Sequence, residues 1–242
     1  MKRFYKNVDV RRQDGDQADG SGPGPGWQVT LDERGVKTVG GAAQIVPSHA
    51  IARSLAAEWE AQGQTLDPKS FVLRDLADYA IDVVARQSGD VVEKLLNYGE
   101  TDTLLYRADP DEPLYARQLE IWEPIVAAFE AREGVELVRI SGIVHRPQPD
   151  ATMARFRKRL CDLDPFALAG MEIMASLACS LTTALNAAEP DANSEEFWDA
   201  ASLEEEWQAE LWGRDEEAEN RRNERKAQFL TACDWVRAVR HT

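Results

Sequence analysis

Hydrophobic and polar residues alternate in the first part of the chain and recur at helical spacing in most of the rest. Trp27, Val29 and Leu31 alternate with polar neighbours, which is typical of a half-buried strand. Asp32, Glu33 and Gly35 have turn composition, so the residues after them are predicted to return as a hairpin partner. We predict strands over residues 2–10, 27–31, 36–39 and 43–46.

Helical spacing begins after a capping residue. Ser48 can cap a helix in which Ile51, Leu55 and Trp59 recur every four residues, so we predict that Trp59 faces inward and is structural. Residues 135–144 form an apolar stretch that is predicted to be a strand or an extended arm. We predict helices over residues 49–62, 72–86, 88–98, 114–132, 152–163, 165–188, 195–212 and 216–240.

The order of these elements predicts an α+β protein with two domains. A run of Asp and Pro at residues 109–113 has the composition of a linker. We therefore expect a small strand-rich domain with packing helices over residues 1–110 and a helical bundle over residues 111–242. Residues 13–26, dominated by Gly, Pro and Asp, are predicted to be a mobile loop.

Composition narrows the class of protein. Of 242 residues, 43% are hydrophobic and 29% are charged, which is ordinary for a globular protein, and no apolar run is long enough to span a bilayer. The start of the chain lacks the apolar core of a secretory signal, so we expect a cytoplasmic protein without membrane insertion. A net charge of −15 argues against nucleic acid as a partner. Cys161, Cys179 and Cys233 form no metal-binding pattern and are expected to be reduced.

The usual motifs of catalysis and cofactor binding are missing from the sequence. His49, His145 and His241 have no partners at metal-ligand spacing. Neither a phosphate-binding glycine motif nor a nucleophile elbow occurs. We therefore expect no catalytic residue, no cofactor and no metal.

One acidic, tryptophan-containing stretch stands out: residues 202–217, SLEEEWQAELWGRDEE. Residues 191–219 contain twelve carboxylates and one arginine, so they carry −11 of the net charge. Such charge is most often a solvated surface, but exposed aromatic residues ringed by charge also mark protein interfaces.

A helical projection of residues 195–212 separates two faces. Phe197, Ala200, Leu203, Trp207 and Leu211 fall on a predicted buried stripe, in which Leu203 and Trp207 are structural. Glu204 falls within the same arc, where an arginine of the last helix (Arg221, Arg222 or Arg225) could pair with it. Trp198, Glu205 and Trp212 fall on the opposite face, where the two tryptophans could pack on a neighbouring helix or bind a partner.

Two other functions remain open at this point. Glu204, Glu205 and Glu206 could serve a metal-dependent hydrolase, although carboxylate-bridged metal sites in helical bundles usually add a Glu-x-x-His pair that is missing here. The chain could also be an acidic adaptor with another protein client.

Nine short motifs occur together in one order along nearly the whole chain. They are RFYKNV at 3–8, WQVTLDERGVKT at 27–38, PS at 47–48, AAEWEAQG at 56–63, LDP at 66–68, YGETDTLLYRA at 98–108, RQLEIWEPI at 117–125, LDPFALAGME at 163–172 and LEEEWQAELWGRDEE at 203–217. This set resembles the ATP synthase assembly chaperones of the ATP-twelve type, which hold the free alpha subunit of the soluble catalytic sector.

The resemblance implies an α+β domain followed by an orthogonal helical bundle, with no catalysis. It implies a chaperone, expected to be monomeric, that binds the unassembled alpha subunit and shields its subunit interface. Eukaryotic relatives are mitochondrial, whereas this chain resembles a bacterial, cytoplasmic member. We expect the acidic helix and the turn after it to bind this partner. The predicted partner-binding residues are Trp198, Glu204, Glu205, Gln208, Trp212, Asp215 and Glu216.

Overall fold

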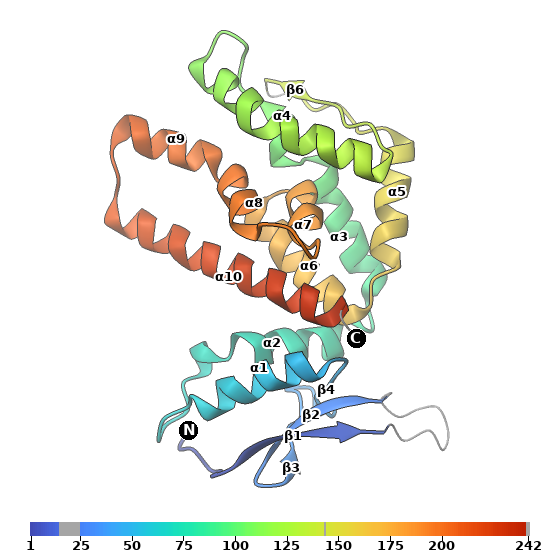
Figure 1. Ribbon diagram of the computed structural model, residues 1–242, viewed down its shortest axis with the longest axis vertical. Helices are drawn as coiled ribbons and strands as arrows, with labels where there is room; N and C mark the ends of the chain where they lie inside the picture. Colours follow the sequence, from blue (N-terminus) through green and yellow to red (C-terminus); the bar gives the residue numbers. More distant parts are fainter. Residues whose placement is uncertain (15–24, 143, 241–242) are drawn as a thin grey trace. The chain divides into compact units, whose positions relative to one another are not determined.

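The computed structural model describes residues 1–14, 25–142 and 144–240, and it confirms the α+β class (Figure 1). The chain divides into two compact units. The first comprises Met1–Ser88, Asp164–Ala169 and Trp235–Thr242, and the second comprises Gly89–Leu163 and Gly170–Asp234. Residues 89–110, expected in the N-terminal domain, group with the second unit. Most of the predicted loop at residues 13–26 lies outside the described residues.

The first unit contains a four-stranded antiparallel sheet. Its strands are β1 (Val8–Gln13), β2 (Gly26–Leu31), β3 (Arg34–Gly35) and β4 (Ile45–Val46). The central strand β2 pairs with all three others, and Val10 lies opposite Val29. The alternation predicted for residues 27–31 is therefore a strand, while pairing of the first strand begins only at Val8.

A two-residue turn joins β2 to β3 and brings the chain back earlier than predicted. Asp32 and Glu33 have φ values of 47° and 72°, so both lie in the left-handed region that a two-residue hairpin turn requires. The Asp32 carboxylate accepts hydrogen bonds from the backbone N–H groups of Lys6 (3.1 Å) and Asn7 (2.9 Å). These bonds lower the pKa of Asp32 and hold the segment before β1 against the turn.

Helix α1 (His49–Glu60) lies against one face of this sheet (Figure 1). It is followed by the 3₁₀ turn η1 (Pro68–Ser70), by α2 (Val72–Tyr79), which packs on α1, and by the π-helical turn η2 (Ala80–Val84). Ser48 caps α1 through Ile51 N–H, as predicted, and Trp59 is buried with 7% exposure. The Trp59 ring contacts Tyr5 and Phe71, with centroids 5.6 and 4.5 Å away.

The second unit is mainly helical. Its elements are α3 (Ser88–Glu100), η3 (Thr103–Leu105), β5 (Tyr106–Arg107), α4 (Pro113–Glu133), β6 (Ile140–Ser141), α5 (Asp150–Cys161), α6 (Pro165–Ala178), α7 (Leu181–Ala187), α8 (Ser194–Ala201), α9 (Leu203–Trp212) and α10 (Glu216–Arg240). Both α6 and α10 also extend into the first unit.

Several predicted elements are shorter than the hydrophobic pattern suggested. The helix expected over residues 165–188 breaks at Cys179, which has a left-handed φ of 48°, and Ser180 then caps α7. Residues 135–144 were expected to be a strand or an extended arm; among residues 135–142 and 144, the pair Ile140–Ser141 is a strand, parallel to β5, and the others are not in a helix or strand. Apolar spacing continues across these breaks because both sides face the same core, so the pattern alone did not reveal them.

Candidate functional site

The predicted acidic helix is two helices. Residues 195–212 were expected to be continuous, but α8 ends at Ala201 and α9 begins at Leu203. Ser202 lies between them with φ −90° and ψ 6°. A break changes the direction of every later side chain, so a single helical projection could not place both halves.

The structure decides between the alternatives for Trp198 and contradicts the placement of Leu211. Trp198 was expected opposite the buried stripe, either packed on a neighbouring helix or bound to a partner; it is 1% exposed and packs on Phe229 of α10, with ring centroids 5.3 Å apart, so it is a packing residue. Leu211 was expected on the buried stripe, but it is 60% exposed. Leu203 is buried as predicted, and Trp207 is half-buried.

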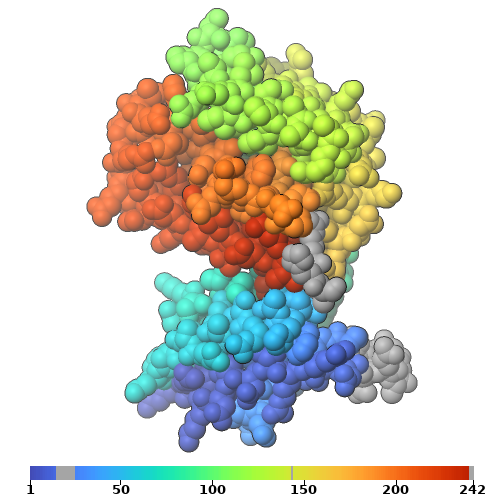
Figure 2. Space-filling model, viewed as in Figure 1, coloured from blue at the N-terminus to red at the C-terminus, as the bar shows by residue number. Residues whose placement is uncertain are grey.

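Trp212 is the exposed tryptophan of this region, as predicted, with 81% of its surface exposed. Together with Leu211 it forms an apolar end to α9. Gly213, with φ 93°, then turns the chain toward α10, and α9 and α10 lie side by side as a helical hairpin (Figure 1). Figure 2 shows this hairpin, coloured orange to red, at the surface of the second unit.

Arginines of the turn and of α10 neutralise much of the acidic charge on α9. Glu206 pairs with Arg214 and Arg222, and Glu205 pairs with Arg225 at 2.8 Å. These ion pairs connect the two helices of the hairpin. Of the three arginines expected as partners of Glu204, Arg222 and Arg225 pair instead with its two neighbours, and Arg221 pairs with Glu217.

Glu204 has a different environment. Its carboxylate accepts a hydrogen bond from Gln118 Nε2 of α4 at 2.7 Å, and it forms no ion pair within the described residues. Burial raises the pKa of Glu204, and the hydrogen bond from Gln118 offsets part of the rise. A half-buried carboxylate without a cation is costly, which makes it a candidate to meet a cation from a partner.

A hollow of about 460 Å³ lies between α9 and α10. It contains four of the predicted partner-binding residues: Glu205, Gln208, Trp212 and Asp215. Of the other three, Trp198 is in the core, Glu204 faces α4, and Glu216 is exposed without lining the hollow.

The same hollow includes arginines that the sequence analysis did not assign to the site. They are Arg221, Arg222 and Arg225, which recur at three- and four-residue spacing on α10. That spacing places them on one helix face and was the available signal. The surface of the hollow therefore carries both carboxylates and arginines, and the exposed aromatic side chain of Trp212 lies beside them.

The geometry is unsuited to a metal centre. Glu204, Glu205 and Glu206 reach toward Gln118, Arg225 and two other arginines respectively, so their carboxylates do not converge. Across residues 1–14, 25–142 and 144–240, no group of three His, Cys, Asp or Glu side chains is placed to hold a metal. No described helix combines the length and hydrophobicity needed to cross a bilayer.

Comparison with known proteins decides the family. The family model "ATP12 chaperone protein" matches residues 2–130, which is more than half of the chain. This chain belongs to the ATP12 chaperone family. Members of the family are non-enzymatic assembly factors for ATP synthase, so the hydrolase alternative is set aside.

Solved structures from bacteria share the whole ATP12-family fold. Atp12 from Paracoccus denitrificans is 32% identical with a TM-score of 0.89, and 98% of each chain is covered. A single-residue mutant of it has the same identity and TM-score, with 97% of its chain covered. Atu1473 of Agrobacterium tumefaciens, described as a candidate chaperone, is 34% identical with a TM-score of 0.86, covering 99% of this chain and 85% of that one. The mitochondrial protein atp12 of Schizosaccharomyces pombe is 27% identical over 236 residues, covering 93% of this chain and 78% of the relative.

Replacing Glu204 with Gln tests whether its charge serves stability. Because folding raises the Glu204 pKa, its favourable contribution is full below the unfolded-state pKa and is lost as pH rises through the folded-state pKa. Glu204→Gln should make stability less dependent on pH across that window. At neutral pH the free energy of unfolding should change by less than about 1 kcal/mol, because relief of desolvation offsets the lost helix-dipole interaction.

Urea unfolding of both proteins between pH 4 and pH 8 measures this effect. Gln118→Leu is the comparison variant, because it keeps the Glu204 charge but removes the hydrogen bond to Glu204. It also removes the 2.8 Å bond from Ala108 N–H to Gln118 Oε1, so its pH dependence, and not its total stability, is compared with that of Glu204→Gln. A loss of several kcal/mol for Glu204→Gln at neutral pH would show instead that the carboxylate charge itself holds the fold.

Proposed function

We propose that this chain binds the free alpha subunit of ATP synthase through the α9–α10 hairpin and shields that subunit's interface until assembly. The main supporting observation is the exposed pair Leu211 and Trp212, beside a hollow lined by both carboxylates and arginines. Tryptophan is among the residues that contribute most to binding energy at protein interfaces, and Trp212 lies next to a second exposed apolar side chain, Leu211.

The charge distribution suits a transient partner. The ion pairs Glu205–Arg225 and Glu206–Arg222 already satisfy much of the surface in the free chaperone, so binding exchanges existing pairs for new ones. Charges arranged in this way direct encounter and orientation more than they add affinity. An apolar anchor within such a surface can cover an aggregation-prone interface and still release it.

We also propose a setting and a stoichiometry. The chaperone acts as a monomer on one alpha subunit, in the bacterial cytoplasm where that subunit is made. The bacterial origin of the similar solved structures supports this setting.

The test is capture of the alpha subunit by a variant carrying Glu205→Lys and Trp212→Ala. Both side chains are exposed, and the Glu205–Arg225 pair is worth at most about 1 kcal/mol, so the fold should persist. We expect co-purification of co-expressed alpha subunit to fall about tenfold, because an interface tryptophan and a reversed charge are both removed.

Glu120→Lys on α4 and Val144→Ala are the matched controls, since both residues are exposed and neither lines the hollow. They should capture the subunit like the unchanged protein. Full capture by the double variant would exclude the hairpin as the binding surface. Failure of the unchanged protein to capture the subunit would refute the proposed client.

A further inference from the structure

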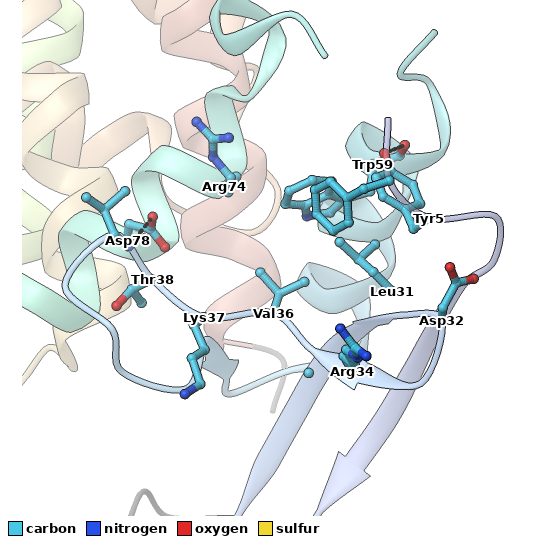
Figure 3. Close-up of a pocket in the computed structure, with 13 residues that line it drawn as sticks. Tyr5, Leu31, Asp32, Arg34, Val36, Lys37, Thr38, Trp59, Arg74 and Asp78 are labelled. Atoms are coloured by element: carbon cyan, nitrogen blue, oxygen red, sulfur yellow. Dashed lines mark hydrogen bonds between the residues drawn. The ribbon is translucent and has the colours of Figure 1, made fainter. Parts of the chain in front are cut away.

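A second hollow, within the first unit, is formed from residues outside the acidic region. It has a volume of about 580 Å³, within the ~300–1,000 Å³ of pockets that enclose ligand groups. Tyr5, Leu31, Val36 and Trp59 supply an apolar lining and are each at most 7% exposed. Figure 3 shows Tyr5, Leu31 and Trp59 gathered on one side of this hollow.

The rim of the hollow carries two exposed apolar side chains. Phe4 is 62% exposed and packs its ring edge-to-face on Tyr5 at 5.3 Å. Val39 is 90% exposed and also lines the hollow, from the segment after β3. Exposed apolar groups around an apolar hollow form a surface that a partner can cover.

The segment carrying Val39 is fixed to the helices by two carboxylates. Asp78 of α2 accepts from Val39 N–H at 3.1 Å. Asp82 of η2 accepts from Gly40 N–H and from the Thr38 hydroxyl, both at 2.8 Å. These three hydrogen bonds hold the backbone on both sides of the exposed Val39 in one position. A contact made there by a partner therefore loses less conformational entropy.

The charge at this rim is opposite to that of the whole chain. Arg34 and Lys37 extend from the strand segment that bounds the hollow (Figure 3). Both are exposed, and neither forms an ion pair within the described residues. The nearby Asp32 carboxylate accepts from two backbone N–H groups, and these bonds contribute most to its lowered pKa, with a smaller contribution from the Arg34 charge. Asp78 accepts from Val39 and Gln44. Two cations are therefore available beside an apolar hollow.

We infer that this hollow is a second client-binding site, which takes a segment of the alpha subunit carrying an apolar side chain next to a carboxylate. The apolar side chain enters between Tyr5, Val36 and Trp59, and the carboxylate pairs with Arg34 or Lys37. The inference rests on the proposed function, but it concerns different residues. Holding one client at two surfaces of different charge would fix its orientation and raise overall affinity through effective concentration.

Site-specific photo-crosslinking distinguishes the two surfaces. A photoreactive phenylalanine analogue replaces Val39 in one protein and Trp212 in another, and each is irradiated with co-expressed alpha subunit. We expect position 39 to cross-link to the alpha subunit. Adding Arg34→Glu and Lys37→Glu should lower the yield at position 39 about fivefold or more, because like charges then face the client carboxylate.

A capture assay with Val39→Glu gives an independent readout. Val39 is nearly fully exposed, so the substitution leaves the core intact, and Val144→Glu makes the same change at an exposed valine of the second unit. We expect Val39→Glu to weaken capture at least fivefold and Val144→Glu to have no effect.

Every other result overturns the inference. Cross-linking at position 212 but not at position 39 would keep the proposed function and refute the second site. Cross-linking of position 39 to a second copy of the chaperone would assign the hollow to self-association. Absence of cross-links at both positions would count against the client as well.

Discussion

Trp59→Ala should lower the free energy of unfolding by about 3–5 kcal/mol, because truncating a buried aromatic side chain leaves a cavity. The ring lies between Tyr5 and Phe71, and Tyr5 Oη donates to the Trp59 carbonyl oxygen at 2.6 Å. Through these contacts the Trp59 ring packs α1 against the segment before β1 and against the start of α2. The total free energy of unfolding of a native protein is only about 5–15 kcal/mol, so this loss should destabilise most of the first unit.

Trp59→Phe is the matched control. The Trp59 indole N–H is buried and has no hydrogen-bond partner in the described part of the chain, so the change to phenylalanine removes no hydrogen bond. We expect a loss of about 1.5 kcal/mol or less.

Amide hydrogen exchange across β1, β2 and α1, together with urea unfolding followed by circular dichroism, measures both variants. If Trp59→Ala retained native protection in these elements, the ring would not be a structural residue. If the two variants were equally destabilised, cavity formation would not explain the effect.

Trp122→Ala should have a comparable effect in the second unit, about 3–5 kcal/mol. Trp122 of α4 is fully buried, and its Nε1–H donates to the carbonyl oxygen of Ala200 at 2.7 Å. That carbonyl lies in the last turn of α8, two residues before the Ser202 break. The tryptophan therefore anchors the point from which α9 departs, so its loss should also weaken capture of the alpha subunit.

Trp122→Phe separates the hydrogen bond from the packing. It should cost less than the alanine change, because most of the apolar contact remains and a single hydrogen bond is worth about 0.5–1.5 kcal/mol. Equal stability of Trp122→Ala and the unchanged protein in urea unfolding would show that α4 does not anchor this junction. Unimpaired capture by a folded Trp122→Ala protein would separate this anchor from client binding.

Local sequence signals predicted which helices and strands form better than they predicted the residues at which each one begins and ends. Ser48 as a cap and the four-residue spacing of Ile51, Leu55 and Trp59 predicted α1 and the burial of Trp59. Both signals act within one helical turn, so no distant contact was needed to interpret them. The hairpin was also predicted, but its two-residue turn required knowledge of φ at Asp32 and Glu33.

The candidate site was predicted only in part, for a geometric reason. Composition identified the acidic stretch and the exposed Trp212, because a tryptophan among carboxylates is unusual whatever the fold. Trp198 of α8 is buried against Phe229 of α10, and after the break at Ser202 Leu211 of α9 is exposed. When the spacing of apolar residues continues through a helix break, that spacing does not reveal where the break lies.

The sequence by itself determined the α+β class, the absence of catalytic motifs and, through nine ordered motifs, the ATP12 chaperone family. These properties depend on residue type and local spacing. Tertiary structure alone decided which carboxylates are free to bind, since Glu205 and Glu206 pair with α10 whereas Glu204 meets Gln118. It also decided that Arg34, Lys37 and Val39 border one apolar hollow with Trp59, because residues distant in sequence meet only when the sheet packs on its helices.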